Sequence, residues 1–392
     1  MPVELSEQLD FILLEKNIVQ ILTENSNNAI QFCLICNLFD SSTEIDTRDE
    51  DLLFQTKKII DRINARHNHR VMFIVRNRKY DKNNMCFMVR NKKAGSLEDV
   101  ITYVREKTLP ENCSIIIDIK LRLNIPYLFI MDFDTKFPHK TRKGLILIAD
   151  KLKNKGYGMA VPRNIVSTSS DHTRYVRYIS NLAFNDIDGI HHLDDYFIPH
   201  WRNFYLYEYL FDNAIFWGKG LLIFENYNFV PKNLAYRVTS HDIAESGYNK
   251  SFFASELYVI NEDPPTEKKW MQRYERWVGG DWLNTIFFFK GKIEGNAKLY
   301  VFNACTLNLY LPTLLVFTID SLFYGYYLGL GFIAYEVIRE IVSQKNIYCV
   351  WFYVKAMFQK SFFGVRACIK ALIRQYVTHK NYMEWQVTGG TK

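Results

Sequence analysis

The chain of 392 residues has few cysteines and no recognisable secretory leader. Its seven cysteines are odd in number and lie mostly in apolar stretches, which excludes a disulfide framework and indicates reduced core residues of a cytosolic domain. Cys33 and Cys36 have the spacing of a redox pair, but they lie inside a strand-like run, which favours core packing. No basic segment followed by an apolar one begins the chain, so we expect no signal peptide.

The sequence also lacks internal repeats, low-complexity linkers and a clustered basic stripe. Its net charge of +7 is mild for this length, and fits a phosphate-bearing ligand or an anionic membrane surface. Without a basic stripe that is interleaved with aromatics, we expect no nucleic acid partner. Aromatic residues are abundant instead, with 29 Phe, 25 Tyr and 7 Trp, which is typical of a large core, a membrane-contacting surface or a sugar-stacking groove.

Alternating apolar patterns predict an α/β fold. Apolar residues recur at helical spacing over 1–28 and again over 48–66, where Asp46 or Thr47 can cap the helix. A further helix begins at Leu97, and apolar runs predict strands at 29–39, 71–75, 113–119 and 127–131. Strands that alternate with helices indicate a mostly parallel sheet, in which ligands bind at the carboxyl ends of the strands. We therefore expect an N-terminal helix over 1–28 and one α/β domain over 29–295.

The last quarter of the chain has a different composition. From Val301 to Tyr335 only Asp320 is charged, and it divides the run into pieces that are short for a bilayer span. A tilted helix, a re-entrant hairpin and a buried helical pair all fit this pattern. The basic residues that follow suit an anionic membrane face, so we expect 296–392 to be a helical, membrane-associated region.

An acidic pair follows the predicted strand at 127–131. Asp132 and Asp134 have the D-x-D spacing that can hold a divalent cation, Mg²⁺ or Mn²⁺, between carboxylate and diphosphate oxygens. The alternative for this pair alone is an acidic turn, because Asp is common in turns.

Two short segments later in the chain carry further polar groups. In "FWGKGLLIFE" (216–225), glycines flank Lys219, so that backbone and ammonium can approach a ligand; the alternative is an ordinary glycine turn. In "VTSHDIAESG" (238–247), His241 and Asp242 lie at a predicted helix start. Asp242 is a candidate general base, and the alternative is a cap that pairs with Glu245.

Arginine and tryptophan combine in "MQRYERWVGGDW" (271–282). Guanidinium groups of Arg273 and Arg276 can clamp a phosphate, and the indole of Trp277 can stack on a sugar face. The alternative is a helix that packs its tryptophans into the core.

The order of these segments resembles the processive, membrane-associated inverting glycosyltransferases, and more narrowly the glycosyltransferase module of bacterial cyclic β-1,2-glucan synthases. The resemblance covers roughly residues 30 to 385. It rests on "RNKKAGSLEDV" (90–100), "MDFDTKFP" (131–138), "KGYGMAVPR" (155–163), "GKG" (218–220), "PKNLAYRVTSHDIAES" (231–246), "RYERWVGGDW" (273–282) and "YVTHKNYMEW" (376–385).

That resemblance implies a GT-A nucleotide-diphospho-sugar transferase fold and transfer of glucose from UDP-glucose to a growing β-glucan, with inversion. Asp132 and Asp134 would contact the divalent metal and the diphosphate, and Asp242 would be the general base. Residues implied at the donor side are Asp40 and Arg276; those implied at the acceptor side are Trp277, Lys219, Gly220, His241 and Arg273. The implied location is the bacterial inner membrane, with the catalytic domain on the cytoplasmic side.

Departures from the pattern leave an alternative open. Asn37 stands where the family has an acidic residue, which leaves Asp40 as the nearby acid, and Gly279 replaces a second arginine. The multi-span N-terminal region and the large phosphorylase-like module of the family are not found in this sequence, so a separately encoded module of either kind is an expected partner. The alternative is a divergent non-catalytic remnant, or a partner subunit that keeps the fold.

Overall fold

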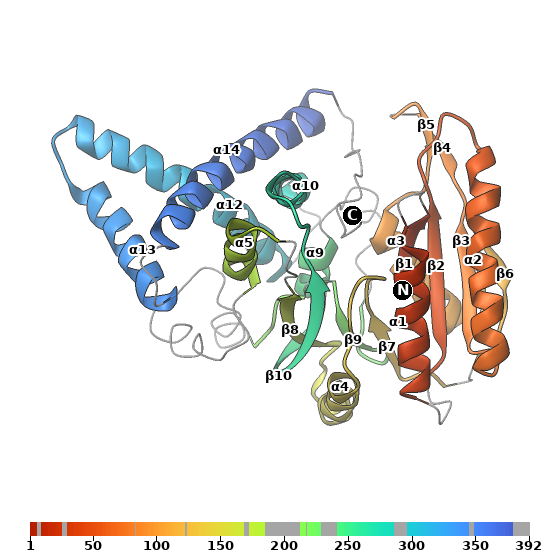
Figure 1. Ribbon diagram of the computed structural model, residues 1–392. Helices are drawn as coiled ribbons and strands as arrows, with labels where there is room; N and C mark the ends of the chain where they lie inside the picture. The colour runs from red at the N-terminus through yellow and green to blue at the C-terminus, as the bar shows by residue number, and fades with distance from the viewer. Residues whose placement is uncertain are drawn as a thin grey trace.

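A computed structural model describes residues 1–5, 9–25, 30–82, 84–121, 124–167, 172–184, 212–216, 218–228, 241–285, 296–344 and 349–378. The N-terminal part forms a four-stranded sheet of order β1-β2-β3-β6 (Figure 1). β1, β2 and β3 are parallel, and β6 is antiparallel to β3. Its elements are β1 (Pro2–Leu5), α1 (Phe11–Thr23), β2 (Phe32–Leu38), α2 (Thr47–Arg66), β3 (Val71–Arg76), the β4 (Lys79–Asp81) and β5 (Cys86–Met88) hairpin, α3 (Lys92–Glu106) and β6 (Cys113–Ile117).

The middle of the chain forms a second four-stranded sheet, of order β10-β8-β9-β7. β10 runs parallel to β8, whereas β9 is antiparallel to both β7 and β8. The elements of this part are β7 (Tyr127–Ile130), α4 (His139–Leu152), the 3-10 helix η1 (Lys153–Lys155), β8 (Met159–Ser167), α5 (Arg174–Phe184), β9 (Gly220–Ile223), α9 (His241–Tyr248) and β10 (Ser251–Glu262).

The α/β class is confirmed, but two expectations about its details are wrong. The predicted mostly parallel sheet is two mixed sheets, because β9 returns between β7 and β8 against both neighbours. The helix expected over 1–28 is divided into a strand and α1. Val3 and Leu5 are buried on one face of β1 while Glu4 points the other way, which is the period of a strand. The domain boundaries at residues 28 and 295 stay a prediction.

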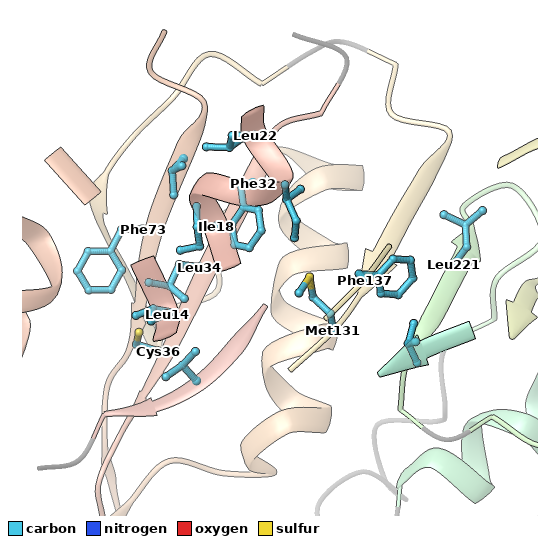
Figure 2. Packing of buried hydrophobic residues seen from close by; sticks show 14 of the residues in the cluster. Leu14, Ile18, Leu22, Phe32, Leu34, Cys36, Phe73, Met131, Phe137 and Leu221 are labelled. Atoms are coloured by element: carbon cyan, nitrogen blue, oxygen red, sulfur yellow. The ribbon is translucent and has the colours of Figure 1, made fainter. Parts of the chain in front are cut away.

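The two sheets share one core. Leu14, Ile18 and Leu22 of α1 pack toward the face of the first sheet that carries Leu34 and Phe73 (Figure 2). Met131, Phe137 and Leu221 extend the same cluster to the second sheet. Because these side chains are almost completely buried, the relative placement of the sheets is fixed by apolar packing.

The thiols of Cys33 and Cys36 lie within β2, and Cys36 belongs to this core. Burial raises the pKa of the Cys33 thiol to about 11, and it raises the pKa of Cys36 still further. Both are free, protonated thiols at neutral pH, so the prediction of core packing is confirmed over that of a redox pair.

Helices dominate the C-terminal part, as predicted for 296–392. α10 (Glu267–Leu283) packs its apolar stripe of Trp270, Tyr274 and Val278 against α5 and α14 (Cys349–Tyr376). α12 (Asn296–Phe323) begins beside α9 and leads away from the second sheet to α13 (Leu328–Gln344), which lies at the end of the molecule opposite the first sheet (Figure 1). In the part of the chain that the structure describes, no helix is both long and apolar enough to cross a bilayer.

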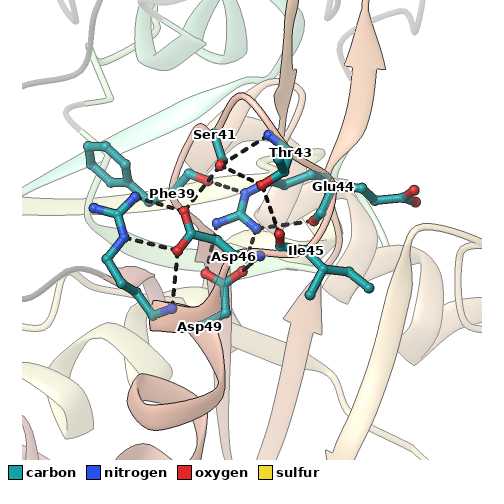
Figure 3. Close-up of polar contacts among 9 residues, drawn as sticks. Phe39, Ser41, Thr43, Glu44, Ile45, Asp46 and Asp49 are labelled. Atoms are coloured by element: carbon teal, nitrogen blue, oxygen red, sulfur yellow. Dashed lines mark hydrogen bonds and ion pairs between the residues drawn. The ribbon is translucent and has the colours of Figure 1, made fainter.

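A buried arginine fixes the loop between β2 and α2. Arg78 donates to the Phe39 and Glu44 carbonyls and forms a paired contact with the Asp49 carboxylate, 2.7 Å between Nη2 and Oδ1 (Figure 3). Asp46 caps α2 and pairs with the exposed Arg48 at 2.7 Å. The loop that carries Asp40 is therefore held from inside by Arg78 and from outside by Arg48.

These two arginines predict very different costs of truncation. Arg78→Ala leaves the buried Asp49 and two carbonyls without their donor, so we expect a loss of about 3–5 kcal/mol in the free energy of unfolding. Arg48→Ala removes an ion pair whose arginine side chain is 59% exposed, with an expected loss below about 1 kcal/mol. Urea unfolding of both variants measures the difference, and equal losses would contradict this account of the loop.

Candidate functional site

The antiparallel pairing of β7 with β9 brings the acidic pair beside the Gly-Lys-Gly segment. Ile130 at the end of β7 lies opposite Gly220 at the start of β9. Asp132, two residues beyond Ile130, therefore lies near the residues that precede Gly220. Leu221 is fully buried, and a shift of register by one residue would turn it out of the core. The apolar packing of β9 thus determines which polar side chains meet at this edge.

Two ammonium groups hold the Asp132 carboxylate. Lys93 Nζ lies 2.7 Å from Oδ1, and Lys219 Nζ lies 3.2 Å from Oδ2. Lys93 belongs to the first turn of α3, whereas Lys219 directly precedes β9. Burial alone would raise the pKa of Asp132, but the two lysines outweigh it and hold that pKa well below its ordinary value. Asp132 is therefore a fixed anion between two cations at neutral pH.

Gly218 lies next to two charged side chains, Lys93, which also pairs with Asp132, and Asp242. Its φ of +73° is a left-handed conformation that glycine adopts without strain. A Cβ atom there would lie 2.9 Å from both Lys93 Nζ and Asp242 Oδ1. These two atoms are thus at most twice that distance apart. The positive φ favours glycine here, and a side chain would also displace the ammonium or the carboxylate that share this space.

The same geometry explains the charge state of Lys93. Burial lowers the pKa of Lys93, but Asp132, Asp242 and Glu245 together raise it above its ordinary value. Lys93 consequently stays charged between the acidic pair and Asp242.

Asp242 lies in the first turn of α9, which begins at His241, so Asp242 follows the helix start and is not its N-cap. The alternative interpretation of Asp242, as the cap of this helix, is therefore not supported.

Asp134 lies in the turn after Asp132 and has a different environment. Burial and the charge of Asp132 raise the pKa of Asp134, and the charges of Lys219 and Arg273 offset part of that rise. Arg273 of α10 donates to Asp263 at 2.9 Å, and its guanidinium carbon lies 4.7 Å from the centre of the Trp277 ring. Arg273 and Trp277 thus form one packed unit, held in place by Asp263.

Arg276 approaches from the same face of α10. Burial and the neighbouring Arg273 lower the pKa of Arg276 to about 10, while Glu4 and Asp132 oppose that shift. Lys92 joins this group to the loop after β2, because its Nζ lies 3.0 Å from Glu4 and 2.8 Å from Asp40. Asp40 is therefore tied to the site through Lys92 and Glu4.

The predicted site residues largely converge. Asp132, Lys219, Asp242, Arg276 and the Arg273–Trp277 unit lie around one region between β7, β9, α3, α9 and α10. Gly220 has a packing reason of its own, because a Cβ there would lie 2.7 Å from the Ala160 carbonyl of β8. The side chain of His241 lies outside the described residues.

Asn37, which departs from the pattern of the synthases that the sequence resembles, has a structural explanation. Its Oδ1 accepts hydrogen bonds from Arg76 at 2.8 Å and from Ser96 at 3.1 Å, which ties β2 to β3 and α3. Arg76 is in turn paired with Asp99 at 2.6 Å. Gly279 lies on the buried side of α10, and nothing in the structure explains why an arginine is absent there.

Sequence reasoning missed two residues of this region. Lys93 belongs to the basic segment 90–100, but no local pattern distinguishes it as the side chain that reaches Asp132. No local pattern marks Glu4 as a site residue, because the sequence predicts a helix there. Its position beside Lys92 depends on the pairing of β1 with β2.

The residues here do not fit a divalent metal as they stand. Within the described ranges, no three His, Cys, Asp or Glu side chains gather in a way that could hold a metal ion. Both oxygens of Asp132 are already engaged by ammonium groups. A metal ion at the predicted ligands Asp132 and Asp134 would have to displace at least one lysine.

Comparison with known proteins gives a distant sequence similarity. No protein-family model matches the chain. The chain is 22% identical over 301 residues to the cyclic beta-(1,2)-glucan synthase NdvB of Rhizobium meliloti, a match that covers 70% of this chain and 10% of that protein. The matched part is thus a small fraction of its relative, and the resemblance to such synthases is supported at the level of distant sequence similarity.

Among solved structures, the mannosyltransferase PcManGT from Pyrobaculum calidifontis, in complex with GDP-Man and Mn²⁺, superposes with a TM-score of 0.46 and 12% identity. The superposition covers 93% of this chain and 85% of that one.

Proposed function

We propose that the chain is an inverting glycosyltransferase of GT-A type that moves glucose from UDP-glucose to a growing β-glucan, of the β-1,2-linked kind. The observation that carries this proposal is the meeting of Asp132, Lys93 and Asp242 around Gly218. The Asp132 carboxylate, the Lys93 ammonium and the Asp242 carboxylate thus lie close together. Arg276 also interacts electrostatically with Asp132. The distant similarity to a cyclic β-1,2-glucan synthase favours this choice of donor and product.

In this proposal the roles divide between acceptor and donor. Asp242 takes the proton from an acceptor hydroxyl, and that oxygen attacks the anomeric carbon from the face opposite the nucleotide. The bond to the diphosphate breaks as the new bond forms, so an α-linked donor gives a β-linked product. The negative charge that develops on the departing nucleotide is stabilised by the cations nearby, among them the partly buried guanidinium of Arg276.

The aromatic and remaining polar groups have a supporting role. Trp277 presents an indole that can stack on an acceptor sugar, and Arg273 fixes it from one side. Asp40 is proposed to contact the nucleotide, and His241 and Gly220 to border the acceptor. The expected Mg²⁺ or Mn²⁺ is not part of this proposal, because both oxygens of Asp132 are engaged by lysines.

We also propose that the C-terminal helices associate with a membrane, with the catalytic region on the cytoplasmic face of a bacterial inner membrane. The end of α12, the start of α13 and the turn that joins them expose large apolar side chains. These are Val316, Phe317, Ile319, Leu322, Phe323, Tyr324, Tyr326, Tyr327, Leu328, Leu330, Phe332 and Tyr335. Exposed apolar surface that is contiguous marks an interaction site, and tyrosines suit the boundary between lipid and water.

The alternative function is a non-catalytic subunit that keeps the fold. The intact set of Asp132, Asp242 and Arg276 favours an enzyme. A transfer assay distinguishes the two, because a binding subunit would hold nucleotide without turnover.

Replacement of the proposed base gives the first test of function. Asp242→Asn keeps the shape of the side chain but cannot accept the hydroxyl proton, so we expect transfer from UDP-glucose to fall by about 10²–10⁴-fold. UDP binding, measured by calorimetry, should change little. The matched control is Asp212→Asn, which alters a carboxylate that is 65% exposed and pairs with Lys250, and which should keep full activity. Retained transfer by Asp242→Asn would rule out its role as the base.

Membrane association has its own test. The double variant Phe323→Ser/Tyr327→Ser removes two aromatic side chains that are 84% and 74% exposed at the hairpin tip. We expect a marked drop in co-sedimentation with vesicles of phosphatidylglycerol and phosphatidylethanolamine, because less apolar surface is buried in the lipid. Phe54→Ser, which changes a 65% exposed aromatic on α2, is the control. Equal co-sedimentation of all three proteins would contradict the proposed surface.

A further inference from the structure

The Asp132 carboxylate is unusual for a predicted metal ligand because each of its oxygens already has a cation. Lys93 and Lys219 approach it from two separate elements, the start of α3 and the start of β9. Both contacts follow from the fold itself. The register of β7 with β9 brings Lys219 to Asp132. The close approach of α3 to Gly218 brings Lys93 to the same carboxylate.

A lysine and a divalent cation are alternatives at such an oxygen. Mg²⁺ and Mn²⁺ bind carboxylate oxygens at short distance and require their own space and further oxygen ligands. An ammonium 2.7 Å from Oδ1 occupies that space. Displacing Lys219 would leave a cation whose side chain is only 9% exposed without its carboxylate, which is costly in a protein interior.

The two ammonium groups retain capacity for a ligand. Each carries three N–H donors, and the contact with Asp132 uses one of them. Phosphate oxygens accept strong charge-assisted hydrogen bonds from such donors. With Arg276 nearby, three cationic side chains of the protein can donate hydrogen bonds to a diphosphate.

We propose that Lys93 and Lys219 bind the diphosphate of the nucleotide donor, and that the chain binds a nucleoside diphosphate without a divalent metal ion. In this arrangement Asp132 positions the two lysines and does not ligate a metal. The inference rests on the proposed function, since it concerns the donor of that reaction. It assigns Lys219 to the donor side, whereas the sequence placed it at the acceptor.

The first experiment measures UDP binding by calorimetry in EDTA and again in Mn²⁺. We expect the same affinity in both buffers. Binding only in the presence of Mn²⁺ overturns the inference and leaves the proposed function intact. No binding in either buffer, together with no shift in melting temperature from UDP-glucose, overturns the proposed function itself.

Variants test the two lysines directly. Lys219→Met and Lys93→Met keep the apolar stem and remove the charge, so each should weaken UDP binding in EDTA by about 10- to 100-fold. The matched control is Lys57→Met, which removes a lysine with the same 2.7 Å pairing to an aspartate, Asp61, on the outer face of α2. Its UDP affinity should equal that of the unaltered protein.

Two further measurements separate a binding role from a structural one. Lys219→Arg keeps the charge and should recover most of the affinity that Lys219→Met loses. Electron paramagnetic resonance of Mn²⁺ should show tighter metal binding by Lys219→Met, because an oxygen of Asp132 is released, and Mn²⁺ should then partly restore UDP binding. Unchanged UDP affinity in both methionine variants, with melting temperatures that confirm folding, would overturn the assignment.

Discussion

The pairing of β7 with β9 is the interaction on which the site depends. Ile130 opposite Gly220 places a carboxylate at the end of one strand beside a lysine at the start of the other. The free energy that fixes this register comes from the buried apolar residues of β9, not from the ion pair. The charged groups are therefore positioned by a core that contains no charge.

Around that pairing, opposite charges alternate over a short distance. Asp132 separates two lysines, Lys93 separates Asp132 from Asp242, and Lys92 separates Glu4 from Asp40. Each buried ion is thus compensated by a neighbour, which is what allows so many to share a partly buried region. A diphosphate that enters this arrangement meets donors already held in place, which lowers the entropy cost of binding it.

Local patterns in the sequence predicted the elements that carry the site, but not their pairing. α2 with its Asp46 cap, the strand before Asp132 and the apolar roles of Cys33 and Cys36 follow from periodicity and composition. The contact of Lys93 with Asp132 joins residues from α3 and β7, and so depends on tertiary packing that no local pattern encodes. β1 was mistaken for helix because a four-residue strand is shorter than the window in which helical spacing is judged.

α10 joins two parts of the molecule that differ in character. One stripe of the helix, Trp270, Tyr274 and Val278, packs into the helical C-terminal part, and the next carries Arg273 and Arg276 toward the site. Glu275 of the same helix pairs with Arg366 and Lys370 of α14 at 2.9 and 3.0 Å. A helix is stiff along its axis, so any rotation or sliding of α10 against α14 moves both guanidinium groups together. The distance between these guanidinium groups and Asp132 therefore depends on how α10 packs against the C-terminal helices.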